Sequence, residues 1–309
     1  MGNIIENPKS YTGEEMAEIF IRPSFTGDNA AALGLRVLYN IPVNTTMNFW
    51  KRRENILKKY AAGWQGGEAS TKYQKTLSME KIKAEQGIEA SDYFAMVYER
   101  ITNTAGVNLQ DLQGTDIENA EVALFRDAIA EKIEKLIWQG DTTSADPDLK
   151  WINGFLALAA AATGVVPVSV AAGTTAWNAL KQVILALPVS VIRRGNVKVF
   201  VSPEFYMGFV LELVEKNFFH YSGPQNSAPE EIVFPGTNIM VAKTDGLSST
   251  NKILATNAEN LFYGTDVENA QEQFKVKYEE DTNLIKVAVR WNSGVQIAFP
   301  DRVVLATLN

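Results

Sequence analysis

The amino-acid sequence predicts an α+β fold, and three stretches of the chain indicate it. A long capped helix begins near residue 115, a helix, a strand and a second helix follow one another between residues 174 and 217, and alternating strands close the chain. Helix, strand and helix in that order favour a compact sheet covered by helices. A chain of 309 residues, 46% of them hydrophobic, can bury a sizeable core.

The first 43 residues predict an extended arm that packs on another structure, because such an arm is a poor unit by itself. Their apolar runs are short, and Pro and Gly interrupt them throughout. The start of the chain lacks the basic and continuously apolar regions of a secretory signal, so we expect no export.

Residues 44 to 84 form a basic part of an otherwise acidic chain. Nine Lys and Arg against three Glu give this segment a net charge of +6, which leaves −13 for the rest of a chain whose formal net charge is −7. Its centre, GWQGGEAS, is rich in Gly around Trp64, and the flanking runs fit either strands or helix. We therefore expect a long excursion with a glycine tip.

A basic cluster is ordinarily a solvated face, but the acidic remainder of this chain favours docking on an acidic surface of another subunit. An exposed Trp between glycines suits an interface anchor, because Trp and Arg carry much of the binding energy in protein interfaces. The residues expected at this interface are Lys51, Arg52, Arg53, Lys58, Lys59, Trp64, Gly66, Gly67, Lys72 and Lys75.

Two helices are expected next. Residues 88 to 101, IEASDYFAMVYERI, predict a short amphipathic helix. The strongest helix signal follows. Thr115 and Glu118 make a capping box, and apolar residues then recur at intervals of three and four residues as far as Ile137. Gly140 ends the pattern. At 1.5 Å per residue this helix would be about 35 Å long.

No charged residue lies between Trp151 and Lys181, which raises the question of a membrane segment. A span needs about 20 predominantly apolar residues. This stretch is mostly Ala, a weak hydrophobe, and Gly164, Pro167 and Gly173 interrupt it. We expect a buried or interface segment, with a membrane-active loop as the alternative.

The later part of the chain predicts a mixed region. TTAWNALKQVILAL is a helix halted by Pro188, NVKVFVS is a buried strand, and SPEFYMGFVLELVEKN is a helix with Ser202 as its cap and Pro203 in its first turn. EIVFPGTNIMV and KILATNAENLFYGTD supply further strands. In the closing run, residues 281 to 300 alternate apolar and polar side chains, and we expect them to form a two-stranded ribbon that turns at Asn-Ser-Gly, residues 292 to 294.

The usual apparatus of catalysis is missing from the sequence. The absence of Cys excludes disulfides, thiolate metal sites and cysteine nucleophiles. The one histidine, His220, is accompanied by no G-x-S-x-G elbow, and there is no phosphate-binding glycine motif. Asp146 and Asp148 predict a turn rather than a calcium loop. We therefore expect no enzyme and no catalytic, cofactor or metal site, and keep a hydrolase built on His220 and a carboxylate as a distant alternative.

The order of the expected helices and strands along the chain resembles that of a known family. KLIWQGD ends the long helix, NGFL follows, VKVFVSPEFYMGFV joins strand to helix, and ILATNAENLFYGTD leads into YEEDTNLIKVAVRWNSGVQIAFPDRVVL. Together these segments resemble the major capsid protein of tailed bacteriophages, with the Hong Kong 97-like fold. The resemblance covers nearly the whole chain, and it lies in the order of the elements rather than in any single motif.

The resemblance implies a division of the chain. An N-terminal arm would take residues 1–43, an extended E-loop 44–84, and a P-domain 85–151 with its spine helix at 116–138. An α/β A-domain would take residues 152–260, and residues 261–309 would return to the P-domain as strands of its sheet.

The resemblance also implies a structural role. The chain would assemble with copies of itself, as pentamers and hexamers, into the icosahedral shell that encloses a double-stranded DNA genome. Scaffolding and portal proteins would be further partners, contact with the packaged DNA would be non-specific, and no membrane would be involved. The protein would be assembled in the host cytoplasm and reside in the virion. The alternative is an encapsulin-like shell subunit of a bacterial protein compartment, which shares the fold but encloses proteins.

Overall fold

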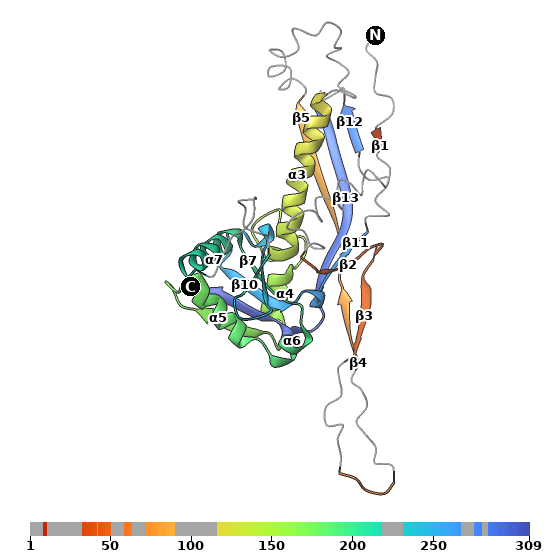
Figure 1. Ribbon diagram of the computed structural model, residues 1–309. Helices are drawn as coiled ribbons and strands as arrows, with labels where there is room; N and C mark the ends of the chain where they lie inside the picture. Colours follow the sequence, from red (N-terminus) through yellow and green to blue (C-terminus); the bar gives the residue numbers. More distant parts are fainter. Residues whose placement is uncertain are drawn as a thin grey trace, which may run out of the picture.

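The computed structural model describes residues 9–10, 33–41, 43–50, 59–63, 72–89, 116–217, 231–266, 275–279 and 284–309. A tall part, built on one sheet and the long helix α3, adjoins a rounder part built on a second sheet (Figure 1). A hairpin extends from their junction, away from the tall part (Figure 1). The expected mixture of helices and sheets is confirmed.

The first sheet has the long strand β13 at its centre. β13 pairs antiparallel with β12, β11 and β5, and β2 joins β11 in parallel at one edge. Its strands are β1 (Lys9–Ser10), β12 (Lys275–Glu279), β13 (Leu284–Ile297), β11 (Leu261–Thr265) and β2 (Arg36–Leu38) in spatial order, with β5 (Glu80–Glu89) on β13.

The turn expected at residues 292–294 is wrong, because β13 runs unbroken through them for 14 residues. Gly294 is needed for another reason. It pairs with Gly264 of β11, and a Cβ on Gly294 would collide with the carbonyl of Ser78 and lie 2.9 Å from Sδ of Met79. The glycine thus marks a close crossing of the chain over the sheet and not a reversal. The partner of β13 in the ribbon is β12, which precedes it.

Helix α3 (Asp116–Gln139) lies along the first sheet, as the apolar periodicity predicts (Figure 1). Its 24 residues make it about 36 Å long. The helix ends at Gly140, whose N–H donates to the Leu136 carbonyl at 3.0 Å. A Cβ on Gly140 would meet the Ile152 carbonyl, so the following chain can fold back closely only because this residue is glycine.

The second sheet forms the centre of the rounder part. Its strands, in spatial order, are β6 (Val166–Val170), β14 (Val304–Leu308), β10 (Lys252–Asn257), β7 (Val197–Val201), β9 (Met240–Lys243) and β8 (Glu231–Val233). The helices of this part are α4 (Phe155–Ala161), α5 (Ala176–Ala186), α6 (Val189–Arg194) and α7 (Pro203–Glu215). Short 3₁₀ turns are η1 (Asp245–Leu247), η2 (Ala258–Asn260) and η4 (Pro300–Arg302).

Both faces of the second sheet are covered, which explains why β7 is buried along its whole length. Val199 packs in the core that α5 and α7 share. Phe200, the next residue, points to the opposite face, where it packs in the core that contains the end of α3 and α4. Trp138 of α3 lies there with its ring 4.9 Å from that of Phe200 and 5.3 Å from that of Phe155.

The expected helix caps in the rounder part are confirmed. Ser202 accepts a hydrogen bond from the Phe205 N–H at 3.3 Å, with Pro203 in the first turn of α7, and α5 ends before Pro188. The charge-free stretch yields α4 and β6, and no helix in the described part of the chain is long and apolar enough to cross a membrane.

The helix expected over residues 88–101 is wrong at its start. Residues 88 and 89 belong to β5, where pairing with Ile285 and Leu284 of β13 overrides the helical periodicity of the segment. The rest of that expected helix, and Thr115 of the expected capping box, lie outside the described residues.

Candidate subunit interface

The excursion expected from residue 44 onward contains a two-stranded hairpin. β3 (Thr45–Trp50) pairs antiparallel with β4 (Lys72–Leu77), so of the two structures that the flanking sequence allowed, strands are found. Exposed and half-buried side chains alternate along both strands. One face of the hairpin therefore packs on the body of the protein, and the other is open.

The inner face anchors the root of the hairpin. The Tyr73 hydroxyl donates to the Ala298 carbonyl at 2.9 Å, and the Lys75 ammonium donates to the Ile297 carbonyl at 2.7 Å. Leu77, at the end of β4, is fully buried. These contacts join the hairpin to the end of β13 and the residue after it.

Four aromatic rings pack at the same place, and we call them the root cluster: Phe49, Tyr73, Phe262 and Phe299. The ring of Phe49 lies 5.5 Å from that of Tyr73 and makes edge contacts with Phe262 at 5.9 Å and with Phe299 at 5.5 Å. Such pairs contribute about 0.5–1.5 kcal/mol each beyond the area they bury. The position of the hairpin root is thus fixed by rings from both the hairpin and the body.

Burial at the root changes the acidity of both anchoring side chains. Burial and, to a lesser extent, the charge of Asp301 raise the pKa of Tyr73, Arg302 opposes this change, and the resulting pKa is about 12. Burial lowers the pKa of Lys75, and the charge of Asp301 opposes this change. The phenol of Tyr73 therefore stays protonated at neutral pH and keeps its donated hydrogen bond.

The outer face carries an exposed aromatic residue that sequence analysis missed. Trp50 is 62% exposed, and the ammonium of Lys72 lies 4.2 Å from the centre of its ring. An exposed Trp that contacts a cation is typical of residues that anchor protein interfaces. The alternation in TTMNFW could have indicated it, because it places Trp50 on the face opposite to Phe49 once the segment is assigned as a strand.

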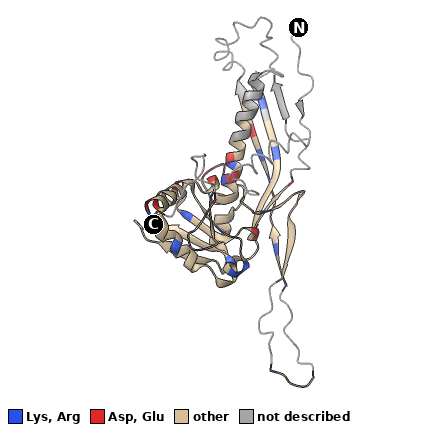
Figure 2. Ribbon diagram, viewed as in Figure 1, with Lys and Arg blue, Asp and Glu red and all other residues tan. Residues whose placement is uncertain are grey.

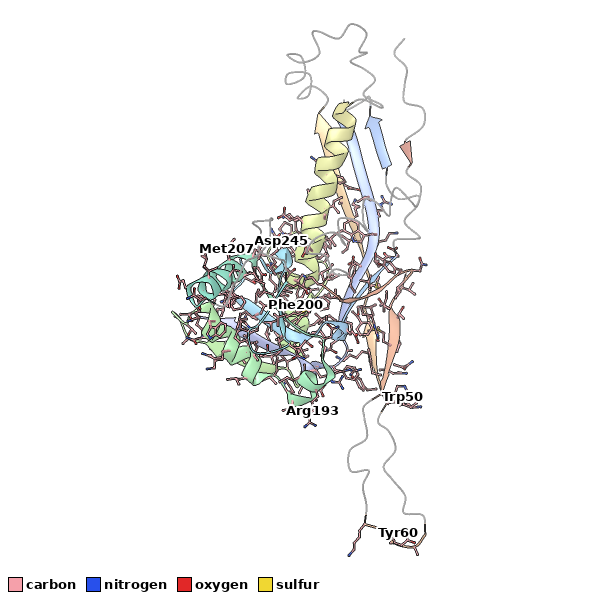
Figure 3. All side chains as sticks on the ribbon, in the orientation of Figure 1. Trp50, Tyr60, Arg193, Phe200, Met207 and Asp245 are labelled. Carbon is pink, nitrogen blue, oxygen red and sulfur yellow. The ribbon has the colours of Figure 1, made fainter. Side chains whose placement is uncertain are left out.

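Residues 59–63 lie beyond the end of the hairpin, far from the body (Figures 1 and 3). All five are exposed, and Tyr60 has 92% of its surface open. Figure 2 shows Lys and Arg on the hairpin, and acidic residues on several parts of the body, among them α3, β5 and α7.

The structure places three of the ten predicted interface residues. Lys59 and Lys72 are exposed, whereas Lys75 is half-buried and anchors the hairpin within its own chain. The others lie outside the described residues, and their role at an interface stays a prediction: Lys51, Arg52, Arg53, Lys58, Trp64, Gly66 and Gly67.

The described part of the chain contains no cluster of metal-ligating side chains. No group of three or more His, Asp or Glu side chains there could hold a metal ion. The turn expected at residues 146–148 is confirmed, since the Asp148 N–H donates to Oδ1 of Asp146 at 2.9 Å. His220 lies outside the described residues.

Solved capsid structures share this arrangement over nearly the whole chain. The procapsid of satellite phage P4 matches with a TM-score of 0.58 at 10% identity, over 94% of this chain and 90% of the other. The capsid of a native GTA particle matches with a TM-score of 0.55 at 12% identity, over 100% of this chain and 94% of the other. The chain has a phage capsid fold.

A virus-like particle has a similar fold. The virus-like particle from Pyrococcus furiosus matches with a TM-score of 0.50 at 11% identity, over 95% of this chain and 98% of the other. No protein-family model and no curated protein sequence matches the chain. The similarity to capsid proteins is therefore found in the three-dimensional structure of the chain and not in its amino-acid sequence.

Proposed function

We propose that the protein is the major capsid protein of a tailed phage, a structural subunit that assembles into an icosahedral shell around double-stranded DNA. The observation that carries this proposal is the capsid fold along 94–100% of the chain in the phage and GTA structures. The exposed aromatic residues Trp50 and Tyr60 support it, because side chains that are open to solvent in this chain can be buried only on another molecule.

The division of the chain follows the same proposal. Residues 44–84 would form the E-loop, with the β3–β4 hairpin as its root, and α3 would be the spine helix of the P-domain beside the first sheet. The second sheet and its helices would form the A-domain, and residues 1–43 the N-terminal arm. The returning strands of residues 261–309 would complete the P-domain sheet, although β14 pairs within the second sheet.

In the assembly, copies of the chain would meet as pentamers and hexamers. The basic E-loop would lie over an acidic surface of a neighbouring copy, and the charge contrast would set the register of the two. Scaffolding and portal proteins would assist assembly in the host cytoplasm, and the inner surface would contact packaged DNA without sequence preference. The role is structural and needs no enzyme activity.

Electron microscopy of the purified protein tests the proposal. We expect closed shells built from this one chain, or rings of five and six copies under conditions that prevent closure. A protein that stays a monomer in sedimentation velocity up to millimolar concentration, with no particles in the micrographs, would contradict the proposal.

An encapsulin-like compartment shell is the second candidate, and the match to a virus-like particle keeps it open. The contents of the particles separate the two functions. Nuclease-protected double-stranded DNA in particles from the native source supports the phage capsid, whereas an enclosed enzyme would support the compartment.

A further inference from the structure

A hollow of ≈ 220 Å³ lies where the hairpin, the first sheet and helix α6 meet. Its wall contains three arginines, Arg36 of β2, Arg194 of α6 and Arg302 of η4. The only carboxylate among its lining residues is Glu259. At this volume the hollow suits one side chain rather than a cofactor, since ligand pockets ordinarily measure about 300–1,000 Å³.

Two of the arginines are held in place by the root cluster. The guanidinium carbon of Arg302 lies 4.2 Å from the centre of the Phe299 ring, and that of Arg36 lies 5.4 Å from the centre of the Phe262 ring. Phe49 of the hairpin contacts both rings and also lines the hollow. Stacking fixes the planes of these guanidinium groups, so less freedom is lost when their N–H groups bind an anion.

The three arginines lack an acidic partner in the described part of the chain, where none of them forms a salt bridge. A buried polar acceptor of one lining residue is also unmatched. Asn257 is 6% exposed, and its Nδ2 donates to the Gly195 carbonyl at 2.6 Å, yet its Oδ1 has no partner among the described residues. Because Nδ2 faces carbonyl oxygens, the amide cannot gain a partner for Oδ1 by turning over.

We propose that this hollow binds the carboxylate of an Asp or Glu side chain brought by a second copy of the chain. The inference rests on the proposed shell function. A peptide segment supplies the missing acidic partner, since its carboxylate pairs with the arginine N–H groups. The bound carboxylate would contact the hairpin root, the first sheet and α6 together, and so add a bond between two copies at this point of the assembly.

A neighbouring copy fits the hollow better than packaged nucleic acid does. A nucleic-acid backbone carries a row of phosphates and needs an extended basic track. This site is a single small hollow with the carboxylate of Glu259 in its wall, which repels a polyanion. A second copy, in contrast, offers many carboxylates, because the chain outside residues 44–84 carries a net charge of −13.

Arg194 and Arg193 provide a matched test. Both are exposed in the last turn of α6, but only Arg194 lines the hollow, and neither stacks on a described ring. We expect Arg194→Gln to raise the protein concentration needed for shell assembly about tenfold. Arg193→Gln should leave that concentration within about twofold, since exposed charges contribute little. Light scattering measures assembly, and thermal unfolding of the unassembled subunit should be the same for both variants.

Cross-linking identifies the occupant directly. In particles assembled from Arg194→Lys protein, a carbodiimide would join the introduced amine to a carboxylate in the hollow. With equal amounts of ¹⁴N- and ¹⁵N-labelled subunits, mass spectrometry should find linked peptides of mixed label. Such peptides show that the acidic residue comes from another copy.

Three outcomes would overturn the inference. Equal assembly of the Arg194→Gln and Arg193→Gln proteins would remove a role for the hollow between copies. Links to Glu259 of the same copy alone would show that the hollow is satisfied internally. Arg194→Gln particles that form normally but hold less nucleic acid would identify a phosphate as the occupant. In each case the unaltered protein still forms shells, whereas failure of the proposed function is seen as the absence of shells from the unaltered protein.

Discussion

Gly294 and Gly264 face each other across β13 and β11 where the chain crosses over the first sheet. A Cβ on Gly264 would lie 2.7 Å from Cδ2 of Leu77 and 3.0 Å from Sδ of Met79, and one on Gly294 would collide with the Ser78 backbone. Residues 77–79 can therefore pass over the sheet only because two side chains are missing below them. This crossing connects the hairpin to β5.

We predict that Gly294→Ala destabilises the protein by about 1–3 kcal/mol, because the added methyl group meets backbone atoms that cannot move freely. The control is Gly208→Ala in α7, where a Cβ meets no heavy atom within 4 Å. That change should stabilise the protein by up to about 1 kcal/mol through helix propensity. Urea unfolding of both variants measures the difference in the free energy of unfolding. A Gly294→Ala protein with an unchanged free energy of unfolding would contradict the close contact between Gly294 and residues 78–79.

The β3–β4 hairpin has two parts with different roles: its root is anchored on the body, and the chain beyond its strands projects away from it. Its root is fixed by Tyr73, Lys75 and the root cluster, whereas the described residues beyond its strands, 59–63, are exposed to solvent. Contacts at the root therefore stabilise the subunit itself. Contacts beyond the strands have energetic value only when a second molecule covers them.

We accordingly predict that Trp64→Ala weakens shell assembly while it leaves the melting temperature of the unassembled subunit nearly unchanged. Loss of an interface anchor costs about 2 kcal/mol or more of association free energy. Sedimentation velocity measures assembly, and circular dichroism follows the melting. Equal destabilisation of the isolated subunit would place Trp64 in a core instead.

On the scale of the whole molecule, one hydrophobic core connects the two parts. It contains Ile129 of α3 and Val289 of the first sheet, and also Phe200 and Leu254 of the second sheet. Trp138 lies between them with 1% of its surface exposed. Two parts that share a core in this way should unfold together.

We predict that Trp138→Ala lowers the free energy of unfolding by about 3–5 kcal/mol while unfolding remains a single transition. The control is Trp151→Ala, because Trp151 is 50% exposed and its loss should cost about 0.5 kcal/mol or less. Calorimetry and far-ultraviolet circular dichroism should give the same midpoint for each variant. Two separate transitions would show that the parts are independent.

The sequence by itself determined those features that depend on neighbours along the chain. The 3.6-residue periodicity that ends at Gly140 indicates α3, Ser202 with Pro203 marks the start of α7, and the apolar run of β7 indicates a buried strand. The basic character of residues 44–84 is also visible in composition alone. Local propensity and charge suffice here because each signal lies within one segment.

The tertiary structure decided what depends on segments far apart in sequence. Asn292, Ser293 and Gly294 have the composition of a turn, yet they continue a strand because they pair with β5 and β11. Arg36, Arg194 and Arg302 show no relation in the sequence, and only folding brings them around one hollow. The physical reason is the same in both cases, since steric fit and the pairing of charges act through space and leave no periodic trace along the chain.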